Sequence, residues 1–386
     1  MPSERLAERQ EIDRWRSEFS LPAYSIYLNH AAVSPLPFRV LSAVDSALRE
    51  AAPGVDQIWL YRLAQCDRVR ESAARLMGAR NAHEIAFVPN TSTGLSYVAE
   101  GLAWDEGDNV VTAESEFPSN VYPWLGLLDR GVDVRRVREV DGRISLEVIE
   151  RAMSPRTRVV ALSWVQYATG FRLDLAAVAK LCWAHDALLV VDAIQGLGAL
   201  PLAVSELGVD VCVAGSHKWL LGGEGIGLLY VSDRVLDRLK PVIRGWLSVD
   251  RPFDPVSEPM EFARGASRFE PGTMNVAGIY GLGAAIEWLL DIGPDRIGRR
   301  VLALAKRAET GLARLGFDLA AAREPGSESG IVSAEHCERT ATALRQELAK
   351  RDIQVADRQE RLRISAHFYN TEDEIDACLS AIAELV

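Results

Sequence analysis

Short apolar runs alternate with longer amphipathic stretches through the first three quarters of the chain. The runs are rich in Val, Leu and Ile, and they predict strands at 85–88, 109–111, 156–165, 187–194, 209–214 and 226–231. Because nearly every position is apolar, these strands are typical of a parallel sheet buried on both faces. Helical spacing of apolar residues predicts helices between them, at 37–50, 56–78, from Leu95 onward, around Trp124 and at 175–184. The alternation of strands and helices predicts an α/β fold.

The order of elements changes after Ile292-Gly293-Pro294, which follows an apolar helix expected at 280–290 and a long loop expected at 244–259. Beyond this break the pattern predicts a helix at 295–315, a strand at 331–334, a helix at 338–351, strands at 353–356 and 362–365, and a last helix from about residue 372. This order is typical of a small α+β domain. We therefore expect a large domain over 20–292, and a small domain formed by 1–19 together with 293–386.

The composition of the 386-residue chain is that of a globular protein, with 48% hydrophobic and 25% charged residues. A formal net charge of -11 disfavours nucleic acid and membrane partners, because both attract basic proteins. The sequence has no apolar run of roughly 18 residues, and its charged amino terminus lacks the apolar core of a signal peptide. The scattered cysteines indicate reduced core thiols in a cytoplasmic protein, and the scattered histidines, without HxxxH or CxxC pairs, predict no metal site.

Residues 188–231 give the first indication of chemistry. Asp192 follows Leu-Val-Val at the exit of one expected strand, and Lys218 follows Ala-Gly-Ser-His at the exit of the next. Ligands of open α/β sheets bind beyond the carboxyl ends of the strands, so we expect both side chains to face one crevice. A lysine can form a Schiff base with the aldehyde of pyridoxal phosphate, and a buried carboxylate can keep the pyridine nitrogen protonated. The alternatives are a helix cap for Asp192 and a solvated position for Lys218.

Two further segments concern phosphate. A strand leads into Asn90-Thr91-Ser92-Thr93-Gly94 and then into a helix, which favours an anion site because helix N-termini present free N–H groups. The alternative is a plain helix cap by Thr91 or Ser92. The glycine-rich run 222–227 opens a strand, whereas a dinucleotide fingerprint opens a helix, so nucleotide binding is disfavoured. A serine hydrolase is disfavoured as well, because the chain has no GxSxG motif.

Arg361 and Arg363 alternate with Leu362 and Ile364, so both arginines are expected on one face of a strand. One interpretation is a solvated outer face. The other is a guanidinium group that binds a substrate carboxylate through two parallel hydrogen bonds.

With these segments in place, the chain resembles the class V aminotransferases of fold type I. This branch holds cysteine desulfurases, isopenicillin N epimerase-like proteins and kynureninase. The resemblance covers nearly the whole chain and is carried by YLNHAAVSPLP, FVPNTSTGLSYVA, VVDAIQGLG, AGSHKWLLGGEGIGLLYV, RFEPGTMN and LRISAHFYNTEDEID. It implies pyridoxal 5'-phosphate as cofactor, a mostly parallel seven-stranded sheet in the large domain and a small C-terminal α+β domain.

The resemblance also implies roles for individual residues. Lys218 would form the Schiff base, Asp192 would contact the pyridine nitrogen and Gln195 the phenolic oxygen. Arg363 would bind the substrate carboxylate, with His30 and Tyr167 on the substrate side. The remaining positions concern the ring and the phosphate: Phe117 would stack on the ring, Thr91, Ser92, Ser216 and His217 would hold the phosphate, and Thr273 would reach the phosphate of the neighbouring subunit in a homodimer.

Two departures from the desulfurase pattern bear on the reaction. Phe117 stands where desulfurases place a histidine over the ring, and residues 354–360 lack the nucleophilic cysteine of that group. A persulfide mechanism is therefore disfavoured. We expect an enzyme that acts on an amino acid through a Schiff base and a Cα carbanion, most readily an aminotransferase. A carbon–sulfur β-eliminating lyase or an epimerase stays open because both share the carbanion. A non-catalytic accessory protein that binds pyridoxal phosphate is a more distant alternative.

Overall fold

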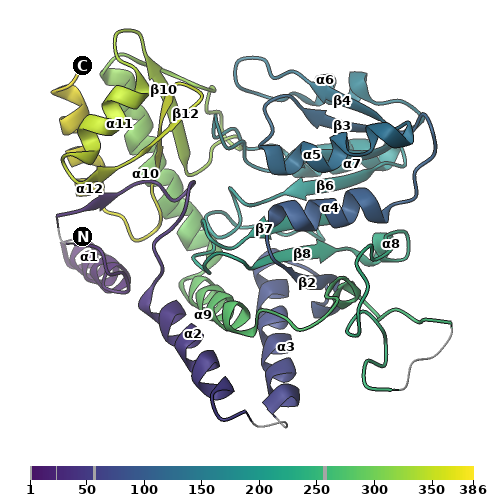
Figure 1. Ribbon diagram of the computed structural model, residues 1–386. Coiled ribbons are helices and arrows are strands. Elements are labelled where there is room, and N and C mark those ends of the chain that lie inside the picture. The colour runs from purple at the N-terminus through teal and green to yellow at the C-terminus, as the bar shows by residue number, and fades with distance from the viewer. Residues whose placement is uncertain (1, 23, 55–57, 255–258) are drawn as a thin grey trace.

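The structure is a computed structural model that describes residues 2–22, 24–54, 58–254 and 259–386. Two groups of elements are arranged side by side, a large sheet with its helices and a smaller C-terminal group (Figure 1). Residues 255–258, from the loop expected at 244–259, and the first two residues of the helix expected at 56–78 lie outside the described residues.

A seven-stranded sheet forms the centre of the large group, in the order β2-β8-β7-β6-β5-β3-β4. Strand β8 runs antiparallel to both neighbours, and the other strands share one direction. Every residue of β2, β3, β6, β7 and β8 is buried, which explains their continuous apolar sequences. The α/β fold with a mostly parallel sheet is thus confirmed. The strands are β2 (Ile85–Val88), β3 (Asn109–Ala113), β4 (Asp133–Val137), β5 (Thr157–Ser163), β6 (Leu188–Asp192), β7 (Val211–Gly215) and β8 (Gly227–Val231).

Helices cover both faces of this sheet. One face packs on α4 and α5, through Leu95 and Trp124 among others. The opposite face packs on α3, α6, α7 and α9, with Ile149, Val178 and Ile286 in its core. The helices of this part are α2 (Phe38–Ala51), α3 (Ile58–Met77), α4 (Thr91–Gly101), α5 (Tyr122–Leu125), α6 (Leu146–Ala152), α7 (Leu175–Ala184), α8 (Asp233–Leu236) and α9 (Val276–Ile292).

The C-terminal group has its own sheet and core. Its four strands are antiparallel in the order β12-β13-β10-β9, and buried apolar residues such as Leu304, Leu344 and Ile364 fill the space under the helices. This matches the expected α+β domain. The elements are α10 (Pro294–Arg314), β9 (Phe317–Leu319), β10 (Ile331–His336), α11 (Ala341–Ala349), β11 (Ile353–Gln354), β12 (Ala356–Arg358), β13 (Arg361–Ser365) and α12 (Glu372–Ala383).

The N-terminal segment joins the two groups. Helix α1 (Pro2–Arg16) is followed by β1 (Ile26–Tyr27), which pairs in parallel with β11 of the C-terminal group. Leu28 belongs to the C-terminal core as well. The boundary expected at residue 20 lies between α1 and β1, and it stays a prediction. At the other boundary, α9 and α10 meet at Gly293 with a bend of 83°.

Within the described residues, no single helix is both long and apolar enough to cross a membrane. The described cysteines are all free thiols. Four are buried, as expected, but Cys337 is exposed, so the expectation of a core thiol is wrong for that residue.

Candidate active site

Asp192 and Lys218 lie at the carboxyl edge of the large sheet, as their positions after two strands predict. Asp192 is the last residue of β6, and β7 beside it ends at Gly215, three residues before Lys218. Both side chains are buried, with 2% of Asp192 and 9% of Lys218 exposed. A carboxylate and an amine are thereby held inside the protein, where either charge is costly without a partner.

The carboxyl group of Asp192 has little to stabilise its charge. Its Oδ1 accepts one hydrogen bond, 2.9 Å from the backbone nitrogen of Ile194. Burial is the main reason that its pKa is raised to about 7, and the nearby carboxyl of Glu116 raises it further. A proton donor placed beside Asp192, such as a pyridinium N–H, would restore the charged form.

Lys218 is equally short of partners. Burial lowers its pKa to about 8, and within the described part of the chain no hydrogen bond contributes to this shift. The guanidinium groups of Arg363 and Arg358 lower it further, while Asp192 opposes them. The Lys218 Nζ lies 5.5 Å from the centroid of the Phe117 ring. A buried lysine with a depressed pKa holds more of its amine in the neutral, nucleophilic form.

The start of α4 faces the end of β7 and can hold a phosphate. The amide N–H groups of Thr91 and Ser92 have no acceptor among the described residues, whereas that of Thr93 is bonded to the Asn90 side chain. The cap is therefore Asn90, and the alternative of a cap by Thr91 or Ser92 is wrong. The Thr91 Oγ1 accepts from the Gly215 nitrogen at 2.9 Å, which joins this turn to the strand that precedes Lys218. Two free amides at a positive helix end form an anion site.

This junction also explains Gly94. A Cβ on Gly94 would lie 2.5 Å from Cγ1 of Val213, so only glycine lets α4 approach β7 this closely.

The other expected phosphate ligands are placed less directly. The Ser216 hydroxyl lies 2.6 Å from the carbonyl oxygen of Gly223 and 2.9 Å from that of Ile226, so its proton is directed into the glycine loop. Burial and the Lys218 charge lower the pKa of His217, which favours its neutral ring. The roles of both residues at a phosphate stay predictions.

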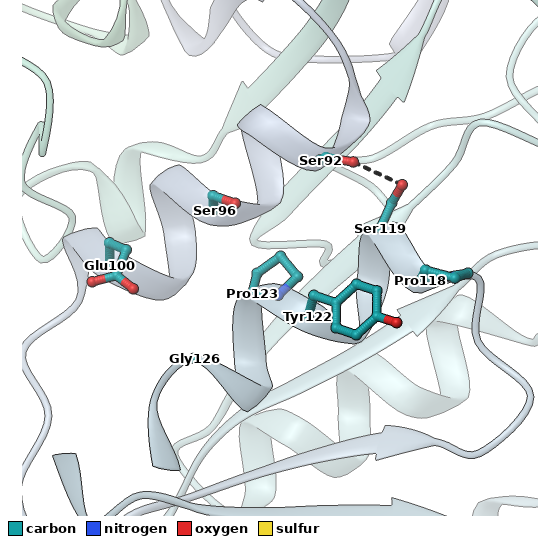
Figure 2. A pocket seen from close by; sticks show the side chains of 8 residues that line it. All are labelled: Ser92, Ser96, Glu100, Pro118, Ser119, Tyr122, Pro123 and Gly126. Atoms are coloured by element: carbon teal, nitrogen blue, oxygen red, sulfur yellow. Dashed lines mark hydrogen bonds between the residues drawn. The ribbon is translucent and has the colours of Figure 1, made fainter. Parts of the chain in front are cut away.

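A separate concavity of about 450 Å³ lies between α4 and residues 118–126 (Figure 2). The hydroxyls of Ser92 and Ser119 meet there at 2.8 Å. The Ser92 side chain thus points toward the segment before α5, and its backbone N–H is the group left for a phosphate. The concavity contains neither Lys218 nor Asp192, and we do not assign it to the reaction.

Arg363 is the most informative residue on the side of the C-terminal domain. It is 1% exposed, and its Nη1 donates to the carbonyl oxygen of Tyr167 at 2.8 Å. Its Nε and Nη2 are buried and have no partner among the described residues. Burial, together with the charge of Arg358, lowers its pKa to about 9. A buried guanidinium with an open pair of N–H groups is suited to a carboxylate from outside the protein.

Tyr167 connects this arginine to the rest of the site. Its ring contacts Phe117 edge to face at a centroid distance of 5.2 Å. The structure therefore brings Phe117, Tyr167, Lys218 and Arg363 together. Arg361, in contrast, has the Glu335 carboxylate 3.6 Å away as a counter-charge, so of the two alternating arginines Arg363 is the one with no carboxylate among the described residues.

Gln195 and His30 are both buried. The Gln195 amide donates to the Ala31 carbonyl oxygen at 3.0 Å and accepts from the Trp219 indole at 3.1 Å, which leaves one amide hydrogen for a ligand. His30 is fully buried, and its ring nitrogens contact the Ser365 carbonyl oxygen at 2.9 Å and the Tyr369 hydroxyl at 2.7 Å. Because both nitrogens are occupied, this geometry disfavours the expected contact between His30 and substrate.

Two residues of the site were not predicted from the sequence. Glu116 is buried behind Asp192, where its carboxylate accepts from the backbone of Ser163 at 2.7 Å and from Gln166 at 2.9 Å. Its position directly before Phe117 was the available signal. Arg358 lies close enough to Lys218 and Arg363 for its charge to lower the pKa of both. Its sequence neighbours are polar, so no pattern distinguished it from a surface arginine.

Thr273 lies apart from these groups on the surface. It is exposed in the loop that leads to the cap of α9, Asn275. An exposed position is required of a residue that would reach another subunit, and that role stays a prediction.

The donor set fits pyridoxal phosphate. Free helix amides suit its phosphate, the buried acid suits its ring nitrogen, and the unpaired lysine suits its aldehyde. The described residues hold no cluster of His, Cys and acidic side chains fit for a metal ion. Fold and site together define a fold type I enzyme that uses pyridoxal phosphate.

The chain belongs to the class V aminotransferase family, whose model matches residues 26–378. An uncharacterized aminotransferase of Bacillus subtilis (strain 168) is 32% identical over 84% of this chain and 85% of its own length. The apo cysteine desulfurase of Thermococcus onnurineus NA1 is 28% identical, with a TM-score of 0.88 over 96% of this chain and 97% of that chain. A cystine C–S lyase solved with its product, cysteine persulfide, is 26% identical, with a TM-score of 0.86 over 94% and 98% of the two chains. These findings confirm the family, the fold type and the cofactor.

Proposed function

We propose that this enzyme is an aminotransferase that acts on an amino acid at the crevice between the two domains. The observation that carries the proposal is Arg363, whose buried and unpartnered Nε and Nη2 share the crevice with Lys218. A substrate carboxylate bound there supplies the missing acceptors and places its amino group on the Lys218 side.

The residues of the chain then have distinct tasks. The cofactor supplies an aldehyde that takes up the amino group and a ring that withdraws electrons from Cα. Lys218, with its lowered pKa, moves the α-proton, because an amine that titrates near the working pH can both accept and donate it. Asp192 holds a proton on the ring nitrogen. The Thr91 and Ser92 amides hold the phosphate.

A carbon–sulfur lyase is the second candidate, favoured by the similarity to the cystine C–S lyase. The two reactions share the loss of the α-proton and differ in what leaves afterwards. Residues 354–360 contain no cysteine, so a persulfide on this segment is not part of either proposal.

A panel of amino acids offered to the holoenzyme without a keto acid separates the candidates. Transamination predicts conversion of the cofactor to its amine form, with one keto acid per site and no ammonia. Repeated release of keto acid with ammonia, and sulfide from cysteine derivatives, would instead establish the lyase. A cofactor spectrum unchanged by every amino acid would contradict both.

We also propose a homodimer with Thr273 near the partner's cofactor. Exposed apolar side chains support it. They lie on α2, α3 and the loop beyond residue 240, and α3 contacts both, through Arg62 on the Ala47 carbonyl oxygen and through Trp59 beside Trp246. They include Leu41, Leu48, Leu60, Tyr61, Val242, Ile243 and Trp246. Sedimentation equilibrium should give twice the chain mass of 42.4 kDa, and a monomer at micromolar concentration would contradict the proposal.

A further inference from the structure

Arg358 is a second cation at the crevice that the proposed reaction does not use. It ends β12, and its ladder partner in β13 is Arg361, which places it on the same sheet face as Arg363. Its one hydrogen bond within the described residues joins Nη1 to the carbonyl oxygen of Asp357, its own neighbour, at 2.7 Å. The side chain is half-buried, so its charge is only partly hydrated.

The hairpin that carries Arg358 has a strained turn that contacts Tyr167. Gln359 and Glu360 form the turn between β12 and β13 with φ of 50° and 64°, a left-handed conformation that non-glycine residues seldom adopt. The Gln359 amide donates to the Tyr167 hydroxyl at 3.1 Å, and Arg363 bonds the carbonyl oxygen of the same tyrosine. The turn therefore fixes Arg358 relative to Arg363, and backbone strain of this kind is concentrated at functional sites.

Acidic side chains near Arg358 are occupied elsewhere. Asp357 accepts a hydrogen bond from the Thr342 hydroxyl, and Glu335 pairs with Arg361. Asp192 is buried at the end of β6, where it suits the cofactor ring. Lys218, Arg363 and Arg358 thus bring three cationic groups to one crevice, and the described residues offer Arg358 no carboxylate. One substrate carboxylate on Arg363 leaves Arg358 still without an anion.

We propose that Arg358 binds an anionic group in the substrate side chain, so that the enzyme acts on amino acids with an acidic side chain. This inference rests on the proposed function, because it takes Arg363 as the site of the α-carboxylate. The anion is a carboxylate or a sulfur oxyacid, both of which accept hydrogen bonds from guanidinium. Arg358 determines specificity, and the proton transfer at Cα does not require it.

Binding of non-reacting acids to the holoenzyme tests this directly. Glutarate, with two carboxylates, and butyrate, with one, are titrated calorimetrically against the wild type and Arg358→Gln. The wild type should bind glutarate about ten- to 100-fold more tightly, as expected for a charge-assisted hydrogen bond, and Arg358→Gln should lose that ratio while binding butyrate normally. Equal affinity of the wild type for the two acids, or an unchanged ratio in the variant, would overturn the proposal.

Two further variants control for loss of structure. Arg361→Gln removes a guanidinium from the same hairpin that is already paired with Glu335, and it should keep the wild-type ratio. Arg358→Lys keeps the charge and should retain a preference for glutarate. A ratio lost equally in Arg361→Gln would mean that the hairpin, and not Arg358, sets the preference.

Amino acids identify the anion and separate this inference from the proposed function. Aspartate, glutamate and cysteine sulfinate are compared with asparagine and glutamine by their effect on the cofactor absorbance. Tightest binding of a carboxylate or of the sulfinate assigns the anion. An equally strong response to asparagine and glutamine would refute the role of Arg358 and leave the proposed function intact. No response to any amino acid would refute the proposed function.

Discussion

Two arginines in this protein are buried to a similar depth and have opposite surroundings. Arg70, on α3, donates through Nη1 and Nη2 to the Glu270 carboxylate at 2.7 and 3.0 Å and to the Ile85 carbonyl oxygen at 2.7 Å. The charge of Glu270 raises the pKa of Arg70 despite its burial. Arg363 has one carbonyl partner and no carboxylate, and burial lowers its pKa to about 9. The fold supplies a counter-charge to one guanidinium and leaves the other for a ligand.

The same contrast holds for two buried aspartates at opposite ends of the sheet strands. Asp210 lies just before β7, and its Oδ2 accepts hydrogen bonds from Arg234 Nη2 at 2.6 Å and from the Leu189 backbone nitrogen at 2.9 Å. Asp192, at the end of β6, has one backbone amide. Burial alone therefore does not distinguish a functional charge from a structural one. The missing partner does, because an uncompensated buried charge costs stability that only function explains.

The largest effect is expected for Lys218→Ala. Removal of the amine that binds the cofactor and moves the α-proton should lower kcat/KM on the order of 10^4-fold or more. The folded protein should be as stable as the wild type, because an unpaired buried charge is lost. Activity assays and chemical unfolding check this, with Lys240→Ala as the control. Activity within tenfold of the wild type would remove Lys218 from the reaction.

On the structural side, Arg70→Met should lower the free energy of unfolding by about 3–5 kcal/mol, since it leaves Glu270 buried without its partner. Its kcat/KM per folded molecule should stay near the wild-type value, because Arg70 lies away from the crevice. Urea unfolding and active-site titration measure the two quantities. A stable variant with impaired turnover would reverse the assignment of Arg70.

Arg363→Gln should show the opposite behaviour. Loss of the two hydrogen bonds to a carboxylate should reduce transition-state stabilisation by about 1.5–3 kcal/mol. The value of kcat/KM for amino acids should therefore fall roughly ten- to 150-fold. Unfolding in urea should show no loss of stability, because the replaced charge has no carboxylate partner in the fold. A destabilised variant with normal KM would make Arg363 a structural residue like Arg70.

The last prediction concerns the pH dependence of stability and Asp192 in the cofactor-free protein, and its effect is the smallest when it is taken per pH unit. Its folded pKa of about 7 exceeds the unfolded value near 4, so between these values the folded state keeps a proton that the unfolded state has lost. Its contribution to stability is therefore present below pH 4 and lost as the pH rises through 7, at no more than about 1.4 kcal/mol per pH unit. Asp192→Asn should lack this slope. Parallel stability profiles of wild type and variant from pH 4 to 7.5 would contradict the raised pKa.

The sequence predicted the buried central strands of the large sheet better than its edge strand β4. Strands with continuous apolar runs, such as β6 and β7, were located, because burial on both faces dictates their composition. Strand β4, Asp-Val-Arg-Arg-Val, was missed, since it is an edge strand whose charged side chains are largely exposed. Helix α4 begins at Thr91, four residues before the expected start, because Asn90 caps a first turn that has no apolar spacing.

The residues of the candidate site could be predicted from the sequence only in part. Asp192 and Lys218 could be found because both follow strands, and their nearness follows from the sheet. Whether a buried arginine has a carboxylate partner could not be predicted, because Glu270 is 200 residues from Arg70 in sequence. His30 was expected at the substrate, but its partners Ser365 and Tyr369 come from the other end of the chain. Long-range contacts decide which polar residues are free.

The most direct test of the central claim is to locate the covalent bond to the cofactor. Borohydride reduction of the holoenzyme fixes pyridoxal phosphate on its lysine, and peptide mass spectrometry identifies that residue. The account predicts the adduct on Lys218, and on none of the other lysines, which are Lys180, Lys240, Lys306 and Lys350. An adduct on any of those four, or no adduct in a protein that holds the cofactor, would contradict it.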